Sequence, residues 1–321
     1  MERDKSLDIA KGLGIILVVW GHMAQACPIK EEIYLFHMPL FFIISGYFFR
    51  YDNIKIFSFV IKKFKSYIIP YIFFFIFAES SFILLYYFTE RSDQIFIYLG
   101  MLIKPYGVVR PLWFFISIFW THCIYYIICI YSNKEKQKLA ISVICLGIAY
   151  ILYKVDIHIP LFIDSALSMV LFLHMGRAIN KYHILELQGK KLFSIVIVGA
   201  IFFCIAIISK LDIDIMINHL GHNPILFFLA AISGSVIILI LSKYINKIEY
   251  VSSVFAYIGR SSLIIFSLHM LCFELARCLL KFPIIENATY WDGIKTTLFG
   301  IVCSIIIAIP LKKFFPFIFK P

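Results

Sequence analysis

The apolar run at residues 7–27 carries three ionisable side chains, Asp8, Lys11 and His22. In an α-helix, Asp8 and Lys11 are neighbours because they are three residues apart. Lys11 and His22 are separated by three turns, with about 20° of drift and a rise of about 16 Å. Both are therefore expected on one helix face, where a long, thin ligand with an anionic head could lie between them. The alternative is that Lys11, held by Asp8, and His22 only extend to the lipid headgroups.

A second histidine, His37, follows in the next apolar run, within F-H-M-P-L-F-F-I-I-S-G-Y at 36–47. His22 and His37 flank the same short loop between the two runs. Imidazole changes its charge near neutral pH and is the group most often used for proton transfer. We therefore expect the two histidines to meet near the outer membrane surface and to take part in acid–base chemistry.

The composition places most of the chain in lipid. Of 321 residues, 62% are hydrophobic and 15% are charged, and the mean hydropathy is +0.91. A soluble core cannot bury that much apolar surface, whereas a bilayer solvates it in spans of about 20 residues. The N-terminal segment has neither a basic leader nor an A-x-A site, so we expect no removable signal peptide.

Ten apolar runs bounded by charged residues are candidate spans. They lie at 7–27, 33–49, 66–89, 112–131, 139–153, 161–179, 192–209, 225–242, 254–280 and 296–318. Lys and Arg are about twice as frequent in the loops on the N-terminal side, which is the bias of cytoplasmic loops. We therefore predict an all-α polytopic membrane bundle of about ten helices with both termini cytoplasmic. The segment 94–105 is too short to span and is expected at the outer interface.

The chain, 1–321, is expected to form a single integral-membrane domain. Its formal charge of +11 is spread through the loops, so membrane orientation explains that charge better than nucleic-acid binding. No metal site is expected either. The eight cysteines include no C-x-x-C pair, and His219 and His222 have no third ligand beside them.

The stretch L-D-I-A-K-G-L-G-I-I-L-V-V-W-G-H at 7–22, followed by Y-L-F-H-M-P-L-F-F-I-I-S-G-Y at 34–47, closely resembles the acyltransferase-3 family of bacterial membrane O-acyltransferases. The resemblance continues through R-P-L-W-F-F at 110–115, D-S-A-L-S-M-V-L-F-L-H-M-G-R at 164–177 and G-R-S-S-L-I-I-F-S-L-H at 259–269. The family's hallmark is a basic residue followed by ten residues and a histidine, which here are Lys11 and His22. Many members have Arg at the basic position, and Lys lacks the bidentate fork of Arg. The chain resembles the single-domain form, without the C-terminal esterase-like domain of many relatives.

This resemblance implies acyl transfer from a thioester to a hydroxyl, which needs a base for the hydroxyl proton and donors for the oxyanion. His22 is then the expected base. His37 would orient it or donate to the oxyanion, and His269 is a weaker candidate for the same group. Lys11, with Arg260, would meet the phosphates of cytoplasmic acetyl-CoA.

Three residues on the outer side are expected to support the acceptor. Arg110 and Trp113 enter the fourth run, where they could hold a sugar or equally anchor the helix at the interface. Asp164 starts the sixth run, where it would orient a histidine or be a favourable charge at a helix N-terminus. Four other ionisable residues are expected to be interhelical hydrogen-bonding partners: Glu79, His122, His174 and Glu274.

The predicted function is an O-acetyltransferase of the bacterial cytoplasmic membrane that uses acetyl-CoA, with no metal, on a surface polysaccharide or its lipid-linked precursor. Its expected partners are that glycan and membrane lipids. Whether the protein forms a homodimer is left undecided by the sequence. Intramembrane His, Glu and Lys also build the proton relays of transporters, so a proton-coupled transporter or polysaccharide exporter is the competing class. We find no inverted repeat in the sequence, and this argues against a transporter. A small-molecule acceptor also stays open.

Overall fold

The computed structural model of the protein describes residues 5–23, 26–51, 54–89, 110–282 and 288–319. Within these ranges the chain is helical apart from its turns and loops, and the only β-type pairing is an isolated bridge between Asp214 and His219. The predicted all-α class is therefore confirmed. The predicted interfacial segment 94–105 lies outside the described residues.

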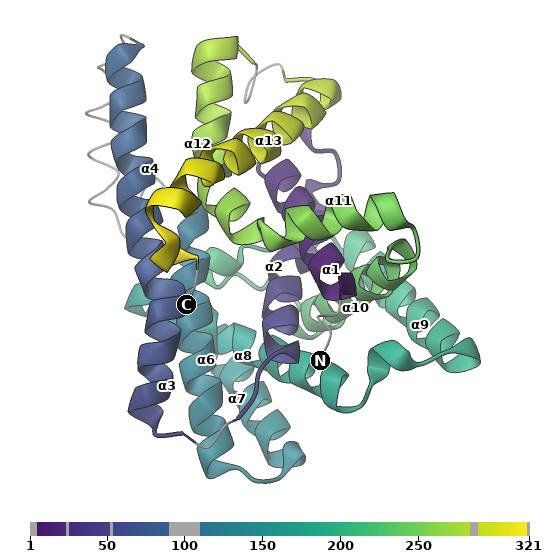
Figure 1. The fold of residues 1–321 in the computed structure, drawn as a ribbon. Coiled ribbons are helices and arrows are strands. Elements are labelled where there is room, and N and C mark those ends of the chain that lie inside the picture. The colour runs from purple at the N-terminus through teal and green to yellow at the C-terminus, as the bar shows by residue number, and fades with distance from the viewer. Residues whose placement is uncertain (1–4, 24–25, 52–53, 90–109, 283–287, 320–321) are drawn as a thin grey trace. The chain divides into compact units, whose positions relative to one another are not determined.

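Figure 1 labels the helices, whose bounds follow in chain order. They are α1 (Lys5–Gly21), α2 (Lys30–Tyr47), α3 (Ile56–Lys63), α4 (Ile69–Phe88), α6 (Trp113–Tyr131), α7 (Glu135–Lys154), α8 (Ile163–Lys181), α9 (Gly189–Ile208), α10 (Pro224–Ile245), α11 (Glu249–Arg260), α12 (Ser262–Leu280) and α13 (Tyr290–Phe314). A π-helical turn, η2 (Phe64–Ile68), joins α3 to α4 without a break. The remaining short elements are 3-10 turns: η3 (Arg110–Leu112), η4 (Pro160–Phe162), η5 (Ile184–Glu186), η6 (Ile215–Ile217) and η7 (Pro316–Ile318).

Within the described residues, eight helical segments are long and apolar enough to cross a membrane. They correspond to eight of the ten predicted runs: α3 to α4, α6, α7, η4 to α8, α9, α10, α12 and α13. α1, which has 17 residues, and α2, which begins with three charged residues, are not among the eight. The chain is thus a multi-pass membrane protein, while the count of about ten and the orientation of the termini stay predictions.

The predicted ninth run, 254–280, is wrong as a single helix. α11 ends at Arg260 and α12 begins at Ser262, with Ser261 between them outside helical geometry (φ −94°, ψ 2°). α11 has 12 residues, too few to span. The hydropathy pattern did not separate the two helices, because the break at Ser261 is too short to interrupt the apolar run.

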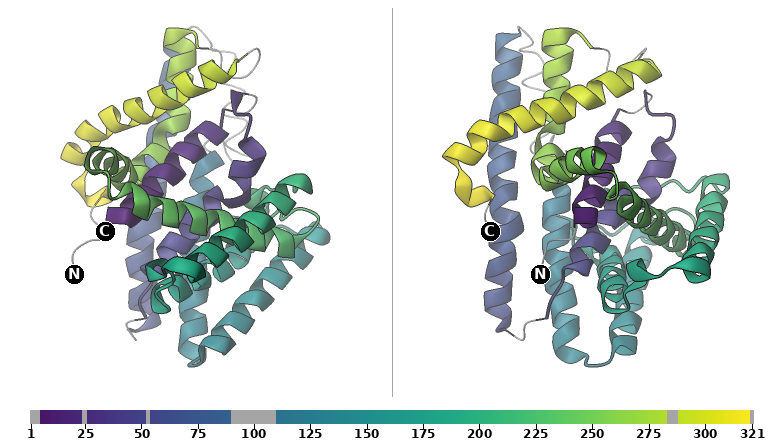
Figure 2. Two further views of the ribbon diagram at one scale, coloured as in Figure 1. Left: turned by 90° about the vertical axis from the view of Figure 1, so that its right-hand side faces the viewer. Right: turned by 45° about the vertical axis from the view of Figure 1, so that its right-hand side comes forward.

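The described residues fall into two compact units. Unit 1 comprises 1–18, 31–60 and 117–260, and unit 2 comprises 19–30, 61–116 and 261–321. In unit 1, α7 packs against α8, and α9 packs against α10. In unit 2, α12 packs against both α13 and α4. These helix pairs can be followed in Figures 1 and 2.

The core of unit 1 includes a cluster rich in aromatic residues, formed by the segment after α2 with α3, α6, α7 and α8. Phe59 stacks on Tyr126 with a centroid distance of 3.9 Å and an interplanar angle of 11°. The hydroxyl of Tyr126 donates to the backbone oxygen of Ile54 at 2.5 Å. The cluster therefore ties the loop after α2 to α6 through both apolar and polar contacts.

Glycines let α2 and α8 touch through their backbones. A Cβ atom added to Gly46 would overlap the carbonyl oxygen of Leu173, and one added to Gly176 would overlap that of Ile43. Membrane helices associate by such close packing because lipid supplies no hydrophobic drive between them. Gly147 in α7 is different, since a Cβ there meets no atom within 4 Å.

We predict that Gly46→Ala or Gly176→Ala lowers the free energy of unfolding by about 1–3 kcal/mol, because the added methyl group forces the two backbones apart. Gly147→Ala is the matched control and should stabilise the protein by up to about 1 kcal/mol, since Ala is the better helix former. Thermal unfolding in detergent micelles measures both. Equal unfolding temperatures for Gly46→Ala and Gly147→Ala would contradict the close contact.

Candidate active site

Lys11 in α1 pairs with Asp8 one turn before it. Its Nζ lies 3.2 Å from Oδ1 of Asp8, whose side chain is only 3% exposed. The ammonium also lies 5.4 Å from the ring centroid of Phe48, a cation–π contact. The prediction that Asp8 and Lys11 are neighbours on the helix, made from their three-residue spacing, is confirmed. Consequently, part of the lysine's charge is already offset within unit 1.

α11 packs closely on this part of α1. A Cβ on Gly12 would overlap a carbonyl oxygen of α11, and a Cβ on Gly259 would overlap the carbonyl oxygen of Asp8. Arg260 follows Gly259 directly and is exposed. Unit 1 therefore brings the end of α11 that carries Arg260 beside the turn of α1 that carries Asp8 and Lys11. Arg260 belongs to α11, not to the helix of His269 as predicted.

His22 lies one residue beyond the end of α1, in a turn. The prediction placed it on the helix itself, but the helix ends at Gly21. In unit 2, this segment packs against α13, with the Trp20 ring edge-on to Tyr290 at a centroid distance of 5.9 Å. The His22 side chain is half-buried there.

Unit 2 brings His22 together with His269 of α12. Their ring centroids are 5.0 Å apart, and the rings meet edge to face at 62°. His269 is completely buried, with Phe273 edge-on to it at 5.7 Å. α12 is one of the helices able to cross a membrane, so this histidine lies within a candidate span. Ionisable groups at such positions are functional candidates because they are expensive to bury.

The hydrogen bonds of His269 determine which of its nitrogens carries the proton. Nδ1 lies 2.9 Å from the carbonyl oxygen of Phe266 and 3.1 Å from that of Ile265. Carbonyl oxygens only accept, so Nδ1 must be the donor and the neutral ring keeps a lone pair on Nε2. Nε2 is buried and has no hydrogen-bonding partner among the described residues. A basic nitrogen is thus held at membrane depth next to His22.

His37 lies in unit 1, on α2, and is 4% exposed. Its Nδ1 donates to the carbonyl oxygen of Ile33 at 2.8 Å, and its ring lies 4.8 Å from that of Tyr34. Neutral His37 therefore carries no hydrogen on Nε2, and it could donate to an oxyanion only as imidazolium. The predicted contact between His37 and His22 stays a prediction, because His37 belongs to unit 1 and His22 to unit 2.

The three residues expected on the acceptor side lie in different surroundings. Arg110 begins η3, but its side chain lies outside the described part of the chain. Trp113 is the first residue of α6 and is 9% exposed. Asp164, in the first turn of α8, accepts from the backbone N–H of Ser165 at 2.9 Å and lies 3.3 Å from Nδ1 of His158. Asp164 does contact a histidine, although it is one that the prediction did not name.

Three of the expected interhelical partners are confirmed. His122 bonds to Ser45 of α2 through Nε2 at 3.1 Å, and His174 bonds to the hydroxyl of Tyr125 at 2.8 Å. Glu274 pairs with Arg277 of its own helix and also accepts from the hydroxyl of Tyr86 on α4. Glu79 is buried in α4.

A charge network at the ends of α7 and α8 was not predicted. Nη1 of Arg177 lies 3.1 Å from both carboxylate oxygens of Glu135, and Lys138 and Lys181 lie 3.3 and 3.2 Å from the same carboxylate. The sequence does contain a sign of this network. Glu135 lies just before one predicted run, and Arg177 lies near the end of the next run, which is at the same side of the membrane if both runs span it.

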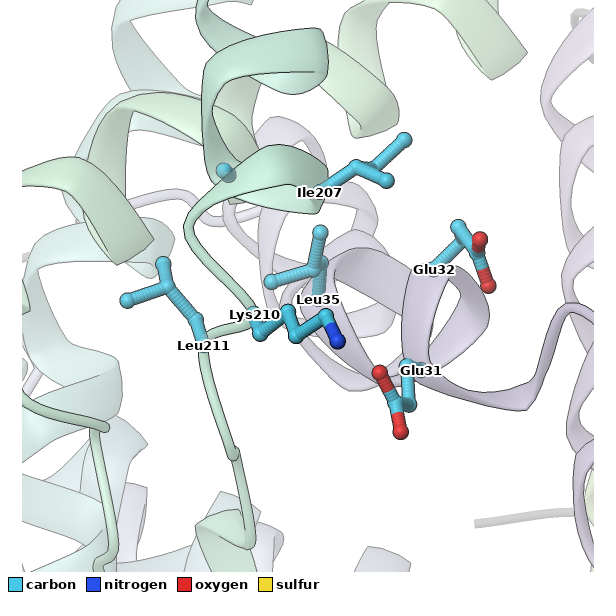
Figure 3. A pocket seen from close by; sticks show the side chains of 7 residues that line it. Glu31, Glu32, Leu35, Ile207, Lys210 and Leu211 are labelled. Atoms are coloured by element: carbon cyan, nitrogen blue, oxygen red, sulfur yellow. The ribbon is translucent and has the colours of Figure 1, made fainter.

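One small pocket lies where α2 begins, between Glu31, Leu35 and Lys210 (Figure 3). It holds about 20 Å³, room for a water molecule but not for a sugar. On the helix, Leu35 and His37 point about 200° apart. This pocket is therefore no part of the histidine site. The described residues contain no group of three His, Cys, Asp or Glu side chains able to hold a metal ion.

Comparison with known proteins assigns the family. Residues 4–313 match the family model described as an acyltransferase domain. The Nodulation protein NolL of Mesorhizobium japonicum and that of Sinorhizobium fredii are each 46% identical to this chain over 14% of its length and 15% of their own, so the match spans only a small part of these relatives. No solved structure matches. Since the family model covers nearly all of the helical bundle, including α1, α2 and α12, the chain belongs to the membrane acyltransferases of this family.

Proposed function

We propose that this acyltransferase transfers an acetyl group from cytoplasmic acetyl-CoA to a hydroxyl of a cell-surface polysaccharide or its lipid-linked precursor in the bacterial cytoplasmic membrane. Family membership supports acyl transfer in general. The donor, the acceptor and the membrane are the proposed parts.

The observation that carries the proposal is the pair of His22 and His269. His269 has a lone pair on a buried Nε2, and the half-buried His22 ring lies 5.0 Å away. We assign His22 as the base because its ring is the more accessible of the two. His269 would accept an N–H of His22 and so orient the base, as the second group of a base–orienter pair does.

The reaction needs one proton to move twice. As the acceptor oxygen attacks the thioester carbonyl carbon, its proton passes to His22 and the new C–O bond forms. The tetrahedral intermediate then collapses with cleavage of the C–S bond, and the leaving thiolate takes the proton back from the imidazolium. A thiolate leaves readily, so a covalent acyl-enzyme is not required.

The donor's phosphates would be held at the Lys11 end of α1. Lys11 supplies a positive charge beside the exposed Arg260 end of α11. Because Asp8 already offsets part of that charge, Arg260 would add what phosphate binding still needs. The half-exposed character of this end fits a ligand that enters from water.

We predict that His22→Ala lowers acetyl transfer at least about 100-fold, because general-base catalysis is worth about 10²–10⁴-fold. His269→Gln, which keeps bulk but loses the basic nitrogen, should lower kcat by a smaller factor and leave the KM for acetyl-CoA unchanged. Incorporation of labelled acetyl groups into surface glycans of cells that produce each variant measures the transfer, and membranes with added acetyl-CoA give the kinetic constants.

His222→Ala is the matched control for these variants, since His222 is an exposed histidine in the loop before α10. It should transfer acetyl groups at the wild-type rate. Undiminished transfer by His22→Ala would remove His22 from the role of base. Solute uptake by proteoliposomes without any acetyl transfer would instead favour the transporter.

We predict that Lys11→Gln weakens binding of acetyl-CoA about 10-fold or more, because a charge-assisted contact is worth about 1.5–3 kcal/mol. The Lys11→Arg variant should bind acetyl-CoA at least as well as wild type, since the planar guanidinium of arginine can donate two hydrogen bonds to one phosphate. Stabilisation of the detergent-purified protein against heat by increasing acetyl-CoA measures both. If acetyl-CoA stabilises Lys11→Gln as much as wild type, the acetyl-CoA site is not at the Lys11 end of α1.

A further inference from the structure

A groove of about 700 Å³ lies in unit 1 between the α8–α9 turn and the end of α10. Its apolar part includes Leu185, Leu192 and Ile240, and its basic edge is formed by Lys243 and Lys247. One carboxylate also lines it, that of Glu186, which lies 2.9 Å from Nδ1 of His183. This volume is within the range of sites that hold small molecules, which is about 300–1,000 Å³. None of the residues assigned to the proposed reaction is among those that line this groove.

The groove is built, not merely a gap between loops. Nζ of Lys243 donates to the carbonyl oxygen of Leu185 at 2.5 Å, which holds the turn against α10. The side chain of Leu185 is buried beneath it. Nζ of Lys247 lies 5.1 Å from the ring centroid of Tyr244, so the second lysine is held at the same edge. Lys190 and Lys191 in the first turn of α9 add to the positive charge nearby.

The groove lies where two candidate spans end. α9 and α10 are both apolar enough to cross a membrane, and only 11% of the apolar stretch of α9 is buried within the structure. Large apolar side chains of α9, including Phe193, Ile197 and Ile201, are exposed. A ligand in the groove would therefore find lysines at one end and an open apolar helix surface at the other.

We propose that this groove binds the headgroup of an anionic phospholipid from the surrounding bilayer, with its acyl chains along α9. Basic pockets at the ends of membrane helices recognise such phosphates, and lysines act there as point charges. A nucleotide suits the groove less well, because the Tyr244 ring, the aromatic surface on which a base could stack, is already in contact with Lys247. By the distribution of Lys and Arg, the lipid would belong to the cytoplasmic leaflet.

The test is retention of lipid by the purified full-length protein. Protein reconstituted in nanodiscs of phosphatidylcholine with phosphatidylglycerol is released into detergent, and bound lipids are counted by native mass spectrometry. Wild type should retain phosphatidylglycerol in preference to phosphatidylcholine. Lys247→Gln should weaken this retention about fivefold, which corresponds to about 1 kcal/mol for one lysine at a membrane surface. The double change Lys243→Gln with Lys247→Gln should abolish the preference.

The control is Lys312→Gln with Lys313→Gln, two exposed lysines in the last turn of α13. This variant should keep the wild-type preference. Because Lys243 also holds the α8–α9 turn, Lys247→Gln alone decides where the double variant does not fold, since the Lys247 side chain makes no hydrogen bond to that turn. Wild-type retention by Lys247→Gln would overturn the proposal. Displacement of the lipid by acetyl-CoA in wild type, but not in Lys247→Gln, would overturn it in favour of a nucleotide site.

Discussion

Direct backbone contact at glycines determines how several helices of this chain approach one another. In unit 1, Gly46 and Gly176 join α2 to α8, and Gly12 and Gly259 join α1 to α11. In lipid every helix already satisfies its own backbone hydrogen bonds, so close packing must supply the attraction between helices. The second of these contacts also places Asp8 and its partner Lys11 beside the end of α11. The position of the proposed donor site therefore depends on residues that have no side chain.

The sequence predicted the helical class and eight of the spans because lipid imposes a simple rule of length and hydropathy. It could not separate α11 from α12, since the break at Ser261 is too short to alter a hydropathy average. The pairing of Asp8 with Lys11 was predictable because it is local. The approach of His269 to His22 was expected only from the family resemblance, and there more weakly than that of His37, because it arises from tertiary packing of segments nearly 250 residues apart in the chain.

Polar groups within the described spans are satisfied in two ways. Serine and threonine hydroxyls such as those of Ser142, Ser235 and Ser304 bond back to carbonyl oxygens in their own helices. Histidines such as His122 and His174 have a partner on another helix, and Nδ1 of His122 also donates to the carbonyl oxygen of Ile118 in its own helix. His269 combines a donor bonded to its own helix with a buried acceptor that has no such partner among the described residues. This difference separates His269, which we propose to orient the base, from His122 and His174, although all three lie in apolar runs of the sequence.

The pairing of Lys11 with Asp8 has a consequence for the way in which the protein is made. A lone lysine within an apolar helix opposes its entry into the bilayer by about 2.5–3.5 kcal/mol on scales of membrane insertion. Here the counter-charge is one turn away on the same helix, so the two enter as a nearly neutral pair without help from any later segment. If α1 is a span, as the sequence predicts, it can therefore insert before α11 has been synthesised. The close contact at Gly12 and Gly259 then forms between α1 and a helix that is synthesised more than 200 residues later.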